Sequence, residues 1–282
     1  MTSALKTLGS LAILLNLGGT AHAQAGKGKG KATPSPAALE VARMGFVEGV
    51  VEIQRPGEAW TKAAEDQPLS MGDRVRTQRG GTARLEFPWT AVAVGDGSEL
   101  SLQNNRVLTV ELERGRLDLD PEQALLRIVT AEATITGSGR TLVRREARTT
   151  FVGSYSGGAD VEAMGTIIRL GVNKGTLANA GAAPAEAQPL GPAPRVVSPS
   201  ADPRYIRPGQ AVPLKWTGRE QAYHLEVLSI DSDVPVMSLD ISSGEYDLRL
   251  NWLGTFRWRV SGRTGPVETQ PSGEGLICVV EK

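Results

Sequence analysis

The sequence predicts an all-β protein made of two modules. Three observations support this: short segments in which apolar and polar residues alternate, turn signals between them, and no long segment with helical periodicity. The 33 glycines and 17 prolines among 282 residues supply the turns that many short strands require. Aromatic residues are 5% of the chain and apolar residues 40%, so we expect cores of Val, Leu and Ile.

The N-terminal segment has the pattern of an export signal. Lys6 precedes an apolar stretch at 8–17, and the sequence at 21–23 is an Ala-His-Ala cleavage site. The apolar stretch is too short to cross a bilayer as a helix. We therefore expect a signal peptide at 1–23, a mature chain without an integral membrane segment, and a periplasmic or secreted location.

The remaining chain divides by composition. A Gly-Lys and Pro-containing run predicts a flexible tether at 24–44, because it cannot bury apolar surface. Short alternating segments with frequent turns predict the first β module at 45–177. An Ala- and Pro-rich run predicts a linker at 178–196, and further alternation predicts a small β-sandwich at 197–282.

Glycine and acid residues mark the turns of the first module. An aspartate in a turn accepts backbone N–H groups, and a glycine adopts conformations closed to other residues. We therefore interpret these residues as structural and not catalytic. They are Gly72, Asp73, Asp96, Gly97, Ser98 and Gly115.

The order of these motifs resembles the FecR domain, a periplasmic all-β domain. The resemblance rests on LSMGDRVRT at 69–77, GGTARLEF at 80–87, DGSELSL at 96–102 and LTVELERGRL at 108–117. It implies a domain of stacked short strands, arranged either as a solenoid or as a sandwich.

The sequence also departs from this family. Its typical regulators carry a cytoplasmic anti-sigma region and a transmembrane helix before the domain, whereas a signal peptide is expected here. Direct binding to a cytoplasmic sigma factor is therefore not expected. The family's later motif, Gly-Thr-x-Phe-x-Val, is altered in this sequence at 139–143. No partner-binding residue of the family is therefore assigned to this chain.

The second module resembles fibronectin type III and immunoglobulin-like sandwiches. Leu214 and Trp216 are similar to the early strand with its tryptophan. The segment GTFRWRV at 254–260 is similar to the late strand of these domains. The resemblance implies a small sandwich of two sheets.

Few residues are suited to catalysis or metal binding. His22 would be removed with the signal peptide, so His224 is the remaining histidine. It lies on a strand of alternating residues and is expected near the protein surface. His224 and Cys278 alone cannot complete a tetrahedral zinc site. Neighbouring acidic residues that could act as calcium ligands are better explained as turn residues. We predict no catalytic residue, no metal and no cofactor.

The net charge and the arginines bear on the class of ligand. Lys+Arg and Asp+Glu both number 31, so no basic excess indicates a nucleic-acid ligand. Arg74, Arg76 and Arg84 could contact an anionic ligand, or could be exposed strand positions paired with glutamates. We predict a non-catalytic interaction module that binds an envelope protein or a cell-wall polymer, in signalling or assembly.

Two other functions remain open at this stage. The chain could bind or hydrolyse cell-wall glycan, with Glu86, Asp96 and Glu99 as candidate carboxylates. It could also be a spacer or filament component that assembles through its sheet edges.

Overall fold

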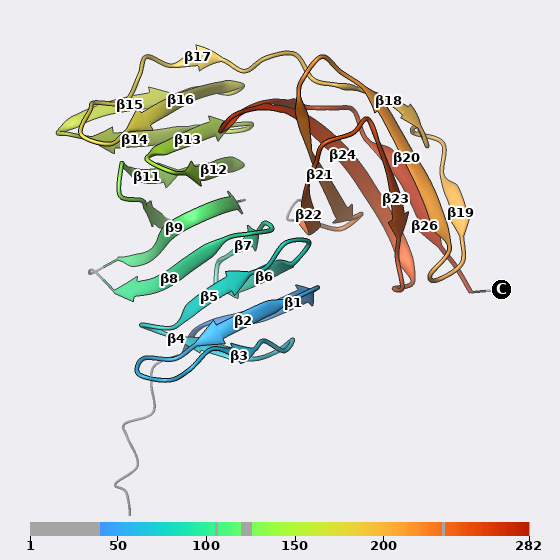
Figure 1. Ribbon diagram of the computed structural model, residues 1–282, viewed down its shortest axis with the longest axis horizontal. Helices are drawn as coiled ribbons and strands as arrows, with labels where there is room; N and C mark the ends of the chain where they lie inside the picture. Colours follow the sequence, from blue (N-terminus) through green and yellow to red (C-terminus); the bar gives the residue numbers. More distant parts are fainter. Residues whose placement is uncertain (1–39, 105–106, 120–125, 233–234, 282) are drawn as a thin grey trace, which may run out of the picture. The chain divides into compact units, whose positions relative to one another are not determined.

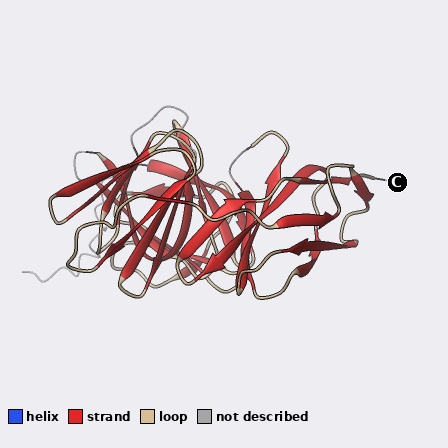
Figure 2. Cartoon of the chain, turned by 90° about the horizontal axis from the view of Figure 1, so that it is seen from above, coloured by secondary structure: helices blue, strands red, loops and turns tan. Residues whose placement is uncertain are grey.

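The computed structural model describes residues 40–104, 107–119, 126–232 and 235–281. These residues are all-β and contain no helix, which confirms the predicted fold class (Figure 2). No helix able to cross a membrane occurs in this part of the chain. The predicted signal peptide, and the tether up to residue 39, lie outside the described residues. The first strand begins at Glu40, so residues 40–44 of the predicted tether belong to a sheet.

The first module contains two sheets, which share strand β9. Sheet A has the spatial order β4 (Pro68–Ser70), β1 (Glu40–Glu48), β6 (Thr82–Phe87), β7 (Thr90–Val94), β9 (Leu108–Leu119), β12 (Thr141–Glu146), β13 (Thr149–Ser154), β16 (Lys174–Asn179) and β17 (Gln188–Pro189). Sheet B has the order β3 (Thr61–Lys62), β2 (Val51–Gln54), β5 (Arg74–Thr77), β8 (Glu99–Asn104), β9, β10 (Arg127–Val129), β11 (Thr134–Gly137), β14 (Ala159–Ala163) and β15 (Thr166–Leu170).

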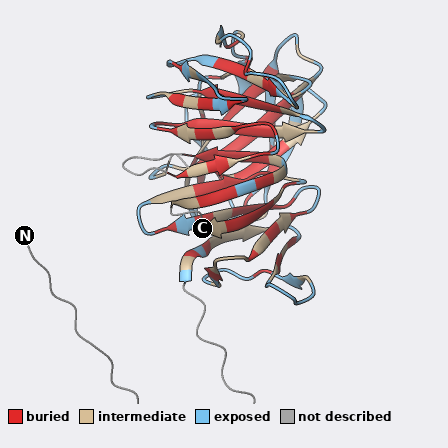
Figure 3. Cartoon of the chain, turned by 90° about the vertical axis from the view of Figure 1, so that its left-hand side faces the viewer, coloured by how far each residue is buried: buried red, intermediate tan, exposed pale blue. Residues whose placement is uncertain are grey.

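The two sheets enclose one apolar core. Side chains alternate along β2, where Val51 and Ile53 are buried while Glu52 and Gln54 face outward. The same alternation recurs on strand after strand, so buried residues run through the middle of the stack (Figure 3). In Figure 1 the strands of this module lie above one another like rungs. The module is therefore a sandwich of stacked short strands.

The second module is a smaller sandwich. Its sheet C contains β18 (Arg195–Ser198), β20 (Ala211–Thr217) and β23 (Glu245–Arg249). Its sheet D has the order β19 (Arg204–Ile206), β26 (Gly275–Val279), β24 (Gly254–Thr264), β21 (Ala222–Ser229) and β22 (Pro235–Ile241), with β25 (Val267–Pro271) also paired with β24. Leu214, Trp216 and Trp258 are buried between the sheets, as the sequence pattern predicted, and Cys278 is buried as well.

The segment predicted as a linker follows the edge of sheet A. Strand β16 extends into it as far as Asn179, and β17 adds a short pairing with β16. Leu190 is buried and packs with Leu142 and Phe151 on the outer side of sheet A. These apolar contacts tie the segment to the first module.

The outer face of sheet A packs against sheet D of the second module. Strand β22 lies against β6 and β7, and Phe46 of β1 meets Trp252 edge to face with 5.1 Å between ring centroids. The layers therefore follow the order B, A, D and C. Sheet D is consequently covered on both faces, which explains why β21 is buried along almost its whole length.

Candidate functional site

The glycine–serine motif of the first module sets the course of β9. The first part of β9 pairs in sheet B and the part after Gly115 pairs in sheet A. Gly115 has a φ of 92°, and a Cβ placed there would lie 2.3 Å from the Ser98 hydroxyl oxygen. Ser98 accepts a hydrogen bond from the Arg116 backbone N–H at 2.9 Å and donates one to its carbonyl at 3.2 Å. This arrangement fixes Arg116 at the outer face of sheet A.

Replacing Gly115 by Ala is expected to destabilise the protein by about 3 kcal/mol, since it combines a disfavoured φ with a clash against Ser98. The measurement is urea unfolding of the purified chain. Gly171→Ala is the matched control, because a Cβ at Gly171 meets nothing within 4 Å. Equal stability of the two variants would contradict this account of the bend.

Strand register then gathers charged residues on the facing sheets. In sheet A, Arg116 of β9 lies opposite Arg144 of β12, so both guanidinium groups leave the same face. In sheet D, Glu226 of β21 lies opposite Arg259 of β24 and His224 lies opposite Asp240 of β22. These side chains meet where the two modules pack together. We call the set the junction network: Arg116, Asp118, Arg140, Arg144, Glu146, His224, Glu226, Asp240, Arg259, Arg263 and Glu268.

Arg116 is the centre of the junction network. Its side chain is 2% exposed and bonds Asp118 of its own strand at 2.6 and 2.8 Å. It also bonds two carboxylates of the second module, Glu226 at 2.9 Å and Glu268. Arg140 of the first module and Arg259 of the second reach the other oxygen of Glu226, at 2.7 and 2.6 Å. One carboxylate is thus shared by three arginines from both modules.

Arg144 forms a second set of bonds across the junction. Its guanidinium donates to Glu268 at 2.8 Å and to both oxygens of Asp240 at 2.8 and 2.9 Å. Arg263 of the second module bonds Asp240 at 2.6 Å and also Glu146 of the first module. Each module therefore supplies both cations and anions, so neither can be withdrawn without exposing unpaired charges.

Burial and charge act in opposite directions on the carboxyl groups. Burial alone would raise the pKa of Glu226 and Glu268, but the surrounding guanidinium groups lower the Glu226 pKa well below its usual range and that of Glu268 to about 2. Asp240 follows the same pattern, its pKa being lowered by His224 and Arg144 despite burial. Asp118 differs, because burial outweighs its arginine partner and raises its pKa. The carboxyl groups of Glu226, Asp240 and Glu268 are therefore ionised at neutral pH, whereas burial favours the protonated form of Asp118.

Asp118, His224 and Glu226 also satisfy the spacing of a metal site. Their ligand atoms lie within 4.8 Å of one another. However, Arg116 bonds both carboxylates, and Glu226 is held by two further arginines. These guanidinium groups occupy the lone pairs that a metal ion needs, and their positive charge opposes a second cation. The donor set fits ion pairing and not a cation site.

The expectation that His224 lies near the surface is wrong. Its side chain is 1% exposed, with Nδ1 2.7 Å from Asp240 Oδ1 and Nε2 2.9 Å from Ser238 Oγ. The alternation along β21 correctly assigned its polar and apolar side chains to opposite faces. However, the polar face is covered by the charged face of sheet A and not by solvent. Periodicity cannot distinguish these two environments.

The predicted anion-contacting arginines do not form one cluster. Arg74 and Arg76 lie together on β5 of sheet B, where both guanidinium groups face the ring of Trp60 at 5.5 and 4.1 Å from its centroid. Arg74 is paired with Glu99 at 2.5 Å and Arg76 with Glu52 at 2.7 Å. Arg84 lies on β6 of sheet A, with its nearest acid Glu86 at 3.5 Å.

The turn residues have structural contacts. Asp73 is buried and accepts a hydrogen bond from the Ser70 backbone N–H at 2.8 Å, and burial raises its pKa. Asp96 lies 3.4 Å from the Gly80 backbone nitrogen. Gly72 and Gly97 have φ values of 86° and 64°, in the left-handed region.

Sequence reasoning missed most of the junction network. Arg116 was noticed as part of a motif, whereas Glu226, Arg259 and Glu268 were not singled out. A signal was present, because β21 carries His-x-Glu and its neighbour β24 carries Arg-x-Arg, each alternating with apolar residues. Opposite charges on neighbouring strands can indicate a covered polar face, although they do not identify what covers it.

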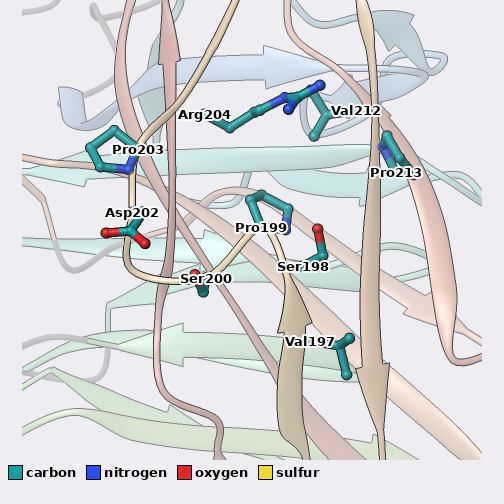
Figure 4. A pocket seen from close by; sticks show the side chains of 9 residues that line it. All are labelled: Val197, Ser198, Pro199, Ser200, Asp202, Pro203, Arg204, Val212 and Pro213. Carbon is teal, nitrogen blue, oxygen red and sulfur yellow. The ribbon is translucent and has the colours of Figure 1, made fainter.

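Cavities lined by described residues adjoin the second module. One, of about 370 Å³, lies beside the segment after β18 and is lined by Ser198, Pro199, Asp202, Arg204 and neighbouring residues (Figure 4). Three of its nine lining residues are prolines, and its charged lining residues are Asp202 and Arg204. Another, of about 390 Å³, adjoins the junction network and is lined by Arg140 and Arg259.

Comparison with known proteins gives distant structural likenesses. No protein-family model and no curated protein matches the chain. Two crystal structures of a "putative anti-sigma factor" from Parabacteroides distasonis are similar over 41% of this chain and 59% of theirs, with 17% identity and a TM-score of 0.36. Domains A168–A170 of titin are similar over 86% of this chain and 96% of theirs, with 12% identity and a TM-score of 0.25. At these values the likenesses carry no argument about function.

Proposed function

We propose that this chain is a non-catalytic interaction protein of the cell envelope, located in the periplasm or secreted. The observation that carries the proposal is the use made of its buried ionisable groups. His224 and the carboxylates of Glu226, Asp240 and Glu268 are engaged in holding the two modules together. Groups fixed in this way stabilise a rigid pair of sandwiches and are not free for acid–base chemistry.

The alternative of a glycan hydrolase is less well supported. Glu86 lies on β6 of sheet A, and Glu99 on β8 of sheet B. Glu99 is bonded by Arg74 at 2.5 Å and by Arg114 at 3.2 Å. A hydrolase needs two carboxylates facing one cleft, whereas these two acids belong to different sheets.

The edge strand β15 is the contact surface that we assign to the proposed function. Among the described strands its ladder partner is β14, which pairs with one side of it. Ile167 is 61% exposed and Met164, in the adjoining turn, is 73% exposed. The single charge of the strand, Arg169, is neutralised by Asp160 at 2.8 Å. Edges without protective charges accept an added strand, so the expected occupant is an extended segment of an envelope protein.

Photo-crosslinking in intact cells tests this proposal. A benzophenone amino acid at Ile167 is expected to give one discrete protein adduct, because the added strand would lie within reach of that side chain. The same probe at Leu253, which is 51% exposed in the second module, is the matched control and is expected to give none.

The outcomes separate the competing functions. A discrete adduct at Ile167 that disappears at Leu253 supports a protein partner on β15. Equal adducts at both positions, a smear of wall polymer, or turnover of a glycan panel by the purified chain would each contradict the proposal.

A further inference from the structure

A polar cavity opens where three loops of the first module meet the second module. Its volume is about 390 Å³, within the range of small-molecule sites. Arg140 precedes β12, Tyr155 and Ser156 follow β13, and Asn173 precedes β16, so neighbouring strands of sheet A deliver them to one end. The lining residues are Arg140, Tyr155, Ser156, Asn173, Arg259, Gln270 and Pro271.

Two arginines of this cavity have unused hydrogen-bonding capacity. Arg140 is 9% exposed and Arg259 is 6% exposed, and both donate to the same oxygen of Glu226. Arg140 Nε and Arg259 Nη2 are buried and have no hydrogen-bond partner among the described residues. Buried donors on charged groups are costly when unsatisfied, so an acceptor with negative charge would stabilise them.

The carboxylates near the cavity do not satisfy these two donor nitrogens. Glu226 accepts hydrogen bonds from both arginines and also from Arg116. Glu274 lies 3.6 Å from Arg259 Nη1, and it also pairs with Arg257 at 3.2 Å. Each nearby carboxylate therefore serves more than one guanidinium group, so neither Arg140 nor Arg259 has a carboxylate of its own.

The other lining side chains suit an oxyanion. The guanidinium of Arg140 lies over the Tyr155 ring at 4.7 Å from its centroid, which restricts its orientation. Burial raises the pKa of Tyr155, so its phenol stays neutral and can donate a hydrogen bond. Asn173 and Gln270 contribute amides that can donate as well. Arginine with neutral donors is the usual set for carboxylate and phosphate groups.

We propose that this cavity binds a small oxyanion, the carboxylate or phosphate group of a ligand, between Arg140 and Arg259. The site lies on both modules, so a bound anion would add a further bond across the junction. This inference goes beyond the proposed function and does not depend on which partner occupies β15.

Isothermal titration calorimetry of the purified chain with inorganic phosphate and with acetate tests the site. We expect saturable binding of at least one of the two anions at constant chloride concentration. Asn173→Asp should weaken that binding by about tenfold or more, because it places a negative charge in the cavity. The substitution leaves the Arg–Glu226 bonds intact, and the φ of 57° at Asn173 suits Asp as well as Asn.

Asn179→Asp is the matched control, since it makes the same charge change at an exposed residue of β16 outside the cavity. It should bind like the parent chain. Absence of saturable binding, or equal weakening in both variants, would overturn the proposal.

A second arm distinguishes the source of the oxyanion. A short peptide with a free C-terminal carboxylate is compared with its amide. Binding of the carboxylate form with loss in the amide would identify a peptide end as a competent source. Binding of phosphate or acetate, with equal or absent binding of both peptides, would identify a free small anion.

Discussion

Replacing Arg116 by Met is expected to lower the free energy of unfolding by about 3–5 kcal/mol. The thioether keeps the apolar stem but removes the guanidinium that bonds Asp118, Glu226 and Glu268. These carboxylates would remain buried with fewer partners, and the desolvation penalty of a buried charge is then uncompensated. Urea unfolding followed by tryptophan fluorescence measures the loss.

Arg114→Met is the matched control for this variant. Arg114 lies two residues earlier on β9, its side chain is 61% exposed, and it pairs with Glu99 at 3.2 Å. Exposed ion pairs contribute about 0–1 kcal/mol, so its removal should cost less than that. Similar losses in the two variants would show that Arg116 is not buried in a junction between the modules.

Acid is expected to destabilise the protein mainly between pH about 4.5 and about 2. The pKa of Glu268 is about 2 in the folded chain, against 4.5 in an unperturbed side chain, and the pKa values of Glu226 and Asp240 are lowered too. The unfolded chain therefore binds more protons in this window, and stability rises with pH across it. For Glu268 alone the shift corresponds to about 3 kcal/mol at neutral pH.

Asp118 acts in the opposite direction but does not reverse the trend. Burial raises its pKa, so the folded chain takes up this proton first as the pH falls, which offsets part of the loss. Unfolding measured at pH 7, 4.5 and 2.5 should show a plateau followed by a fall. In Glu268→Gln the fall should be smaller, and an identical fall in both chains would contradict the assigned role of Glu268.

The fold class and the cores could be predicted from sequence because they depend on local alternation. Leu214, Trp216 and Trp258 are buried where their periodicity placed them. Residues such as Gly115 and Ser98 were noticed as turn signals, since their backbone requirements are local. The start of β1 at Glu40 was not predicted, because its pairing with β4 and β6 depends on residues far along the chain.

The junction network could not be predicted in the same way. A polar face of a strand has the same sequence pattern whether water or a second charged sheet covers it, and His224 illustrates this. The pairing of Arg116 with Glu268 joins residues 152 positions apart. Strand register explains each half of the network, whereas the contact between the halves is a tertiary property.

Differential scanning calorimetry of the full chain tests most directly the claim that the junction network joins the two modules into one body. We predict a single cooperative transition at pH 7 in which both modules unfold together, and two separated transitions in Arg116→Met. Two well-separated transitions in the parent chain would contradict the claim, because they would show that the two modules unfold independently.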